Sequence, residues 1–301
     1  MTRPATSPLT ANLICMASML VWAAGLPAAD LLIGPLHPLP LTALRMALAA
    51  AVLLPLWLVL DGWAVLRAAP WRRGVLVGGI GFGLGAYLLI LAQALSDAVT
   101  VAVITAAMPV VGIALECALD GRRLRLSLVL GLALSLAGGV LAYGARVGGV
   151  GVGLGAVAAL ASVLAFTWGS RATVMAFPAL TPIGRTTITL TGAALVTAVA
   201  ALVAAGMGAP APDWAAIGGR EIAALALCSI GALAVSQVLW ILSVGQLGIG
   251  LASLHINAAP FYVMIFMVLL GGTWNNMQAL GAAIVGIGVL VAQGLPARQT
   301  A

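Results

Sequence analysis

The chain has 301 residues, of which 63% are hydrophobic and only 7% are charged. Because an ordinary soluble domain carries roughly 25% charged residues, this composition excludes a water-soluble globular fold. The formal net charge of +6 comes from arginines that lie mostly between apolar runs, which favours control of membrane topology over binding to nucleic acid.

Apolar residues recur in runs of about 20, the length at which a helix spans the roughly 30 Å hydrocarbon layer of a bilayer. The runs lack the two-residue alternation of a membrane barrel, so they predict helices. We therefore expect an all-α polytopic membrane protein with short connections between its spans. The ten predicted spans are residues 9–34, 39–60, 74–95, 98–119, 126–145, 150–176, 184–206, 220–244, 249–271 and 276–295.

The distribution of arginine predicts the orientation of these spans. The first run exceeds the 7 to 15 apolar residues of a signal-peptide core, so it is interpreted as a membrane span. With the N-terminus in the cytoplasm, ten arginines fall on the cytoplasmic side and only Arg45, Arg146 and Arg220 fall on the other. Short cytoplasmic loops are enriched in arginine, and both termini are therefore predicted to be cytoplasmic.

An offset of about 150 residues relates the two halves of the chain. The segment "ITAAMPV" aligns with "HINAAPF", so that Pro109 falls on Pro260, and Trp22 in "VWAAG" has a counterpart in Trp168 of "FTWGS". Each half would hold five spans, and an odd number inverts the second copy in the membrane. The pattern predicts two inverted five-helix repeats, residues 1–148 and 149–301, that form one membrane domain.

Together these features resemble the drug/metabolite transporter superfamily, EamA type. The resemblance is carried by the ten spans, the two repeats, the tryptophan in the first span of each half, Arg45 in the second span, and the alanine-rich segments before Pro109 and Pro260. It implies a small-molecule transporter of the bacterial inner membrane that works by alternating access. The aromatic content further resembles the bacterial amino-acid exporters, which implies neutral or aromatic amino acids as substrates.

Polar and aromatic residues within the spans are the candidate substrate-binding residues. Each polar one is costly in hydrocarbon unless it is paired or faces a cavity, and a cavity for amphipathic molecules needs aromatic walls with few polar groups. For each aromatic ring, packing against lipid or a neighbouring helix is the alternative. The predicted set is Trp22, Tyr87, Thr105, Met108, Trp168, Gln237, Trp240, His255, Asn257 and Tyr262.

Pro109 and Pro260 are expected to kink the fourth and ninth spans, because proline removes a helix hydrogen bond and crowds the preceding turn. The carbonyls freed in this way need cover from protein or water, which places a central cavity between these two spans. The alternative is that both prolines only shape packing. His255 and Asn257 lie about 200° apart around an ideal helix, so both face one cavity only if the helix is distorted.

Three charged or titratable side chains have two interpretations each. Asp30 and Arg45, near the non-cytoplasmic ends of consecutive spans, form a structural pair, or Arg45 recognises a charge on the substrate. His255 is the candidate group for coupling to protons, or it is a neutral histidine bonded to a carbonyl. The sequence contains no nucleotide-binding or metal-binding pattern, so we expect no ATP, cofactor or metal.

Two other functions are compatible with the sequence. A drug or sugar-conjugate transporter would have the same spans, although cationic cargo favours an anionic residue at mid-span, and none is found there. An intramembrane enzyme or a scaffold represents another class. An enzyme needs a catalytic constellation, and the pair of Ser253 and His255 is too generic to indicate one. We therefore predict a transporter that works without ATP and not an enzyme.

Overall fold

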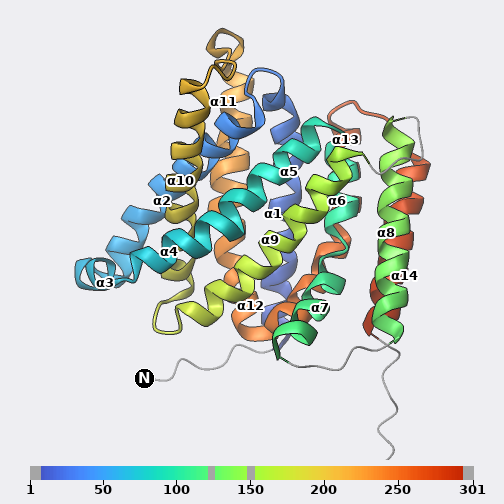
Figure 1. Ribbon diagram of the computed structural model, residues 1–301, viewed down its shortest axis with the longest axis horizontal. Helices are drawn as coiled ribbons and strands as arrows, with labels where there is room; N and C mark the ends of the chain where they lie inside the picture. The colour runs from blue at the N-terminus through green and yellow to red at the C-terminus, as the bar shows by residue number, and fades with distance from the viewer. Residues whose placement is uncertain (1–7, 121–125, 148–152, 294–301) are drawn as a thin grey trace, which may run out of the picture.

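The computed structural model of the chain describes residues 8–120, 126–147 and 153–293. These residues form helices, and no strand occurs among them (Figure 1). The longer α-helices are α1 (Pro8–Ile33), α2 (Pro38–Asp61), α8 (Leu126–Val147), α9 (Leu154–Ala176), α10 (Pro182–Gly206), α12 (Ser236–Ser253) and α14 (Asn276–Gln293). The shorter ones are α3 (Trp63–Ala68), α4 (Trp71–Val77), α5 (Gly85–Ala94), α6 (Ala98–Thr105), α7 (Met108–Asp120), α11 (Gly219–Ala226) and α13 (Ala259–Leu269).

Seven helical segments in the described ranges are long and apolar enough to cross a membrane. They are Leu9–Ile33, Pro38–Asp61, Trp71–Ala94, Ala98–Leu119, Leu154–Ala176, Pro182–Gly206 and Gly219–Gly250. Two further apolar helices, Leu254–Leu269 and Asn276–Gly288, are shorter and fall within the predicted ninth and tenth spans. The predicted all-helical, multi-pass membrane architecture is therefore confirmed, whereas the count of ten spans stays a prediction.

Two of the long segments contain π-helical stretches, in which backbone hydrogen bonds reach one residue further than in an α-helix. The stretch η1 (Gly78–Leu84) joins α4 to α5, and η3 (Leu227–Val235) joins α11 to α12. The glycines of η1 allow another helix to approach closely. A Cβ on Gly81 would lie 2.5 Å from the Cα of Gly169, so η1 and α9 cross backbone to backbone there.

Two other segments are interrupted directly before a proline. Helix α6 ends at Thr105 and α7 begins at Met108, with a turn between them and Pro109 in the first turn of α7. Within this break the Ala107 N–H donates to the Ile104 carbonyl at 3.1 Å, a three-residue step in place of the usual four. The second interruption is the 3₁₀-helix η4 (Leu254–Ala258), which precedes Pro260 at the start of α13.

The helices pack in pairs whose members are distant in sequence. Helix α1 packs against η3 and α12, while α9 packs against η1 and α5. Helix α2 packs against α10, and α6 packs against α13. Figure 1 shows α8 and α14 side by side at one edge of the bundle, where a Cβ on Gly138 would lie 2.6 Å from the carbonyl oxygen of Gly281. The small residues therefore determine how closely these helices approach.

Side-chain hydrogen bonds join the ends of helices that are distant in the chain. The Asp61 carboxylate accepts from the Trp57 indole at 3.0 Å and from the Thr181 hydroxyl at 2.6 Å, which links the end of α2 to the start of α10. The Asp97 carboxylate accepts from the Gln278 amide at 3.0 Å, which links the start of α6 to α14. These bonds compensate two carboxylates in an otherwise apolar bundle.

Candidate functional site

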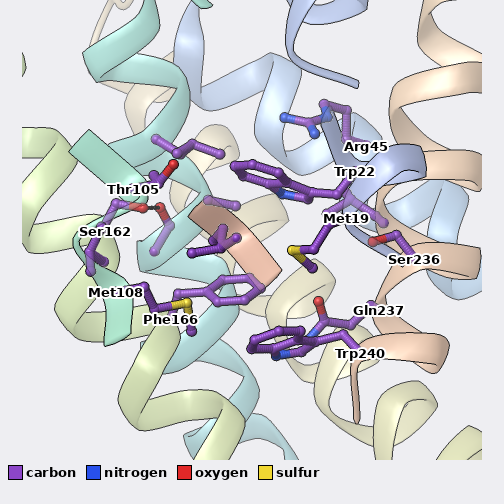
Figure 2. A pocket seen from close by; sticks show the side chains of 16 residues that line it. Met19, Trp22, Arg45, Thr105, Met108, Ser162, Phe166, Ser236, Gln237 and Trp240 are labelled. Atoms are coloured by element: carbon purple, nitrogen blue, oxygen red, sulfur yellow. Dashed lines mark hydrogen bonds between the residues drawn. The ribbon is translucent and has the colours of Figure 1, made fainter. Parts of the chain in front are cut away.

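A cavity lies inside the bundle where α1, α2, α5, α9 and α12 meet, next to both helix interruptions (Figure 2). It encloses about 650 Å³ of empty space, including its mouth. The lining residues are Met19, Trp22, Arg45, Gly85, Ala86, Leu89, Thr105, Met108, Ser162, Val163, Phe166, Leu233, Ser236, Gln237, Trp240 and Ile256.

Aromatic and apolar side chains form most of the cavity wall. Figure 2 shows Trp22, Phe166 and Trp240 around the space, with Met19 and Met108 close to them. The Trp240 indole is held in place because its Nε1 donates a hydrogen bond of 3.0 Å to the Ser170 hydroxyl. Phe166 is held by Phe82, whose ring packs edge-on with a centroid distance of 5.2 Å. Such rings offer a preformed apolar surface to a ligand.

The hydroxyl groups of the wall already donate to backbone carbonyls. The Ser162 hydroxyl donates to Gly85 at 2.7 Å, and the Thr105 hydroxyl donates to Ala102 at 2.9 Å. The Ser236 hydroxyl donates to the carbonyl of Ser18 at 3.0 Å. A hydroxyl has one proton to donate and two lone pairs, so these groups are left to act as acceptors.

Two lining side chains carry buried donors that have no hydrogen-bond partner in the described part of the chain. Arg45 is 4% exposed, and its Nη2 donates to the Cys228 carbonyl at 3.3 Å while Nε and Nη1 donate to nothing. Gln237 is 3% exposed, and its amide nitrogen likewise has no acceptor. Leaving a buried donor unmet costs about 1–3 kcal/mol, and more for a charged group. A ligand that supplies acceptors would recover this free energy.

The structure brings six of the residues predicted from the sequence together around the cavity: Trp22, Arg45, Thr105, Met108, Gln237 and Trp240. Other lining residues were missed because a methionine, a serine or a phenylalanine in an apolar run gives no signal alone. Met19 lies one helical turn before Trp22, and Ser162 lies one turn before Phe166. Including the residue one helical turn before each predicted tryptophan, on the same face of the helix, would have identified Met19.

The remaining predicted binding residues lie outside the set that lines this cavity. Trp168 packs in a separate cluster around Trp57 and Phe177. Tyr262 packs beside the main core, and Tyr87 is half-buried on α5.

His255 and Asn257 flank Ile256, which does line the cavity. Successive residues of a 3₁₀-helix point about 120° apart, so one face of η4 reaches the cavity and its neighbours turn away. His255 Nδ1 lies 3.2 Å from the Ala252 carbonyl, and the buried Asn257 side-chain oxygen has no hydrogen-bond partner among the residues that the structure describes.

Asp30 lies outside the lining set and receives a hydrogen bond from another helix. Its carboxylate accepts from the Gln93 amide at 2.6 Å, and the same Gln93 nitrogen donates to the Leu26 carbonyl. Both contacts tie α5 to α1. The predicted pairing of Asp30 with Arg45 stays a prediction.

Comparison with known proteins identifies part of the chain. The family model described as "EamA-like transporter family" matches residues 9–144. No curated protein matches. A solved structure titled "Crystal structure of protein" is similar with a TM-score of 0.71 and 24% sequence identity, over 97% of this chain and 98% of that chain. At this identity the likeness shows the fold alone. The chain therefore contains an EamA-like transporter family domain, which is consistent with the drug/metabolite transporter superfamily.

Proposed function

We propose that this protein is a secondary transporter that carries small amphipathic metabolites through the central cavity by alternating access. The observation that carries the proposal is the buried cavity itself, whose aromatic wall includes unmatched donors on Arg45 and Gln237. Neutral and aromatic amino acids are the substrates that fit this wall. Export from the cytoplasm across a bacterial inner membrane is the proposed direction, and protons are the candidate coupling ion.

Two irregularities that recur about 150 residues apart support the proposal of ten spans in two inverted repeats. The π-helical stretch η1 begins at Gly78 and η3 begins at Leu227. The interruption before Pro109 likewise corresponds to η4 before Pro260. The first helix of each half also packs against the other half in the same way. Helix α1 lies against η3 and α12, and α9 lies against the corresponding elements η1 and α5. This correspondence fits two related bundles around a shared site.

The contacts between loops support the proposed alternation of the spans across the membrane, whichever face is cytoplasmic. With both termini in the cytoplasm, Asp61 and Thr181 fall on the cytoplasmic side, and their side chains share a hydrogen bond of 2.6 Å. Pro35 and Asp213 fall on the opposite side, where the Asp213 N–H donates to the Pro35 carbonyl at 2.9 Å. The proposed topology therefore places the two partners of each bond on the same side of the bilayer.

Alternating access requires that some elements move while others hold the site together. Residues from both interruptions line the cavity. Thr105 and Met108 flank the break before Pro109, and Ile256 belongs to η4 before Pro260. At such a break the helix lacks its regular hydrogen bonds, so the two parts can tilt separately. We propose that the breaks act as hinges, and that glycine contacts such as Gly81 with Gly169 allow one bundle to slide on the other.

The experiment that tests the function is flux of labelled phenylalanine and leucine into proteoliposomes that contain the full-length protein. We expect saturable flux, and we expect Gln237→Leu to raise the half-saturating concentration about three- to tenfold, because one neutral hydrogen bond contributes roughly 0.5–1.5 kcal/mol. The control is Gln246→Leu, the same change at an exposed position of the same helix. Equal behaviour of the two variants would show that substrate does not contact Gln237.

A further inference from the structure

The charge of the cavity wall points to the charge of its ligand. Arg45 is the one charged residue among those that line the cavity in the described structure. It is 4% exposed, so its guanidinium is held away from water. Arginine stays protonated in proteins, and a buried cation is tolerated only when it is paired and hydrogen-bonded.

The hydrogen bonding of this guanidinium is incomplete. One nitrogen, Nη2, donates to the Cys228 carbonyl at 3.3 Å, a long contact with a neutral acceptor. Nε and Nη1 have no acceptor among the described residues, so both edges of the planar group retain an unused N–H. Guanidinium groups bind carboxylates through such donors, and charge-assisted bonds are about twice as strong as neutral ones.

We propose that Arg45 binds a carboxylate of the transported molecule, so that the cavity selects amphipathic anions and requires the acid group but no amine. The inference rests on the proposed function, because it assigns the substrate class of the same cavity. In the part of the chain that the structure describes, no Asp or Glu lines the cavity, and the hydroxyls of Thr105, Ser162 and Ser236 already donate to carbonyls. An ammonium group would therefore meet a cation without a balancing anion in the wall.

The position of Arg45 also orients the ligand. Figure 2 shows Arg45 toward one end of the group of labelled side chains, with Trp22 and Met19 next along it, and Gln237 and Trp240 toward the other end. A carboxylate at Arg45 places the attached apolar body along Met19 and Trp22.

The test compares four ligands that share a phenyl group on a short alkyl chain. They are 3-phenylpropanoate, its neutral amide 3-phenylpropanamide, the amine 2-phenylethylamine, and phenylalanine, which carries both groups. Binding to the full-length protein in detergent is measured as the ligand-dependent rise in Tm. We expect the acid to bind about ten- to a hundredfold more tightly than its amide and the amine to bind most weakly. Phenylalanine should bind between the acid and the amide, because its ammonium group has no balancing anion in the wall.

Three variants separate substrate binding from a structural role of Arg45. We expect Arg45→Lys to retain the preference for acid over amide. Arg45→Gln should abolish it, with the two ligands binding within about threefold of each other while the affinity for the amide is unchanged. The unchanged amide affinity shows that the cavity is intact, a result that misfolding would not produce. Asp30→Asn, which removes the charge of the predicted pair, should keep the preference for the acid.

The wild-type protein alone decides the inference, even if a variant fails to fold. Equal binding of acid and amide, or tighter binding of the amine, would overturn it. Flux without a preference for the acid would also overturn the inference, but it would support the proposed transport function. An acid preference in binding, with no flux of any ligand in proteoliposomes, would instead support the Arg45 site and contradict the proposed transport.

Discussion

At the scale of single residues, tryptophans in the middle of spans have different surroundings. Trp240 is 1% exposed, lines the cavity and donates to Ser170, whereas Trp168 packs against the cluster of Trp57 and Phe177. Both occur in apolar runs, so the sequence alone predicts that both bind substrate. The helix face that each ring occupies depends on how α9 and α12 rotate against their neighbours, which composition does not specify.

This difference predicts that replacing each tryptophan with leucine will affect a different property of the protein. Trp240→Leu should raise the half-saturating concentration of an aromatic substrate about tenfold, because an aromatic contact contributes about 0.5–1.5 kcal/mol beyond buried area. Trp168→Leu should mainly lower Tm by removing packing. Transport kinetics and thermal unfolding of both variants in detergent provide the measurement. A larger kinetic effect at Trp168 would place the substrate on the other face of α9.

At the scale of elements, the sequence predicted the location of helices better than their internal geometry. The apolar runs coincide with helices because about 20 residues are needed to cross hydrocarbon, a constraint visible in composition. The prolines indicated where the backbone departs from regular geometry, and interruptions occur directly before Pro109 and Pro260. The π-helical stretches η1 and η3 were not predicted, because they depend on the helices that pack against them.

The interruption at Pro260 predicts a kinetic effect. Pro260 has no N–H, and the carbonyl of Ile256 accepts from Ala259 instead. Pro260→Ala restores a donor for a regular helix, so we expect straightening of the span and turnover reduced about tenfold, with little change in substrate affinity. Pro182→Ala is the control, because Pro182 stands in the first turn of α10 and interrupts no helix. Unchanged turnover in Pro260→Ala would remove the break from the mechanism.

The glycine crossing of η1 with α9 predicts an effect on stability. Gly81→Ala would place a Cβ 2.5 Å from the Gly169 backbone, so the helices must separate, at a cost of about 1–3 kcal/mol. Gly286→Ala is the matched control, because a Cβ there meets no atom within 4 Å and alanine is the better helix former. The free energy of unfolding, measured in mild detergent, should fall only for Gly81→Ala. A loss of equal size in both variants would argue against a tight crossing.

At the scale of the whole molecule, the sequence indicated the class of protein but not the arrangement around the cavity. Composition and run length are global quantities, and they led to a multi-pass helical membrane protein. The lining residues come from α1, α2, α5, α9 and α12, among others. That convergence depends on tertiary packing between residues far apart in the chain. The weak internal repeat was the one sequence signal that related distant segments, and it pointed to both interruptions.

The proposed orientation can be tested by thiol labelling. In a chain whose native cysteines are replaced by alanine, Trp63→Cys and Met207→Cys occupy positions that are 62% and 82% exposed. We expect a membrane-impermeant thiol reagent added to intact cells to label Cys at position 207 and to spare position 63 until the membrane is opened. The reverse pattern would mean that the chain is inserted in the opposite orientation.

The central claim is that the cavity binds and carries a small amphipathic molecule without ATP. Counterflow tests it most directly: proteoliposomes are loaded with unlabelled phenylalanine and diluted into labelled phenylalanine, with and without a pH gradient. The account predicts a transient, saturable accumulation of label that needs no nucleotide and that Arg45→Gln reduces. Linear, unsaturable entry equal to that of protein-free vesicles, with folded protein present, would contradict it.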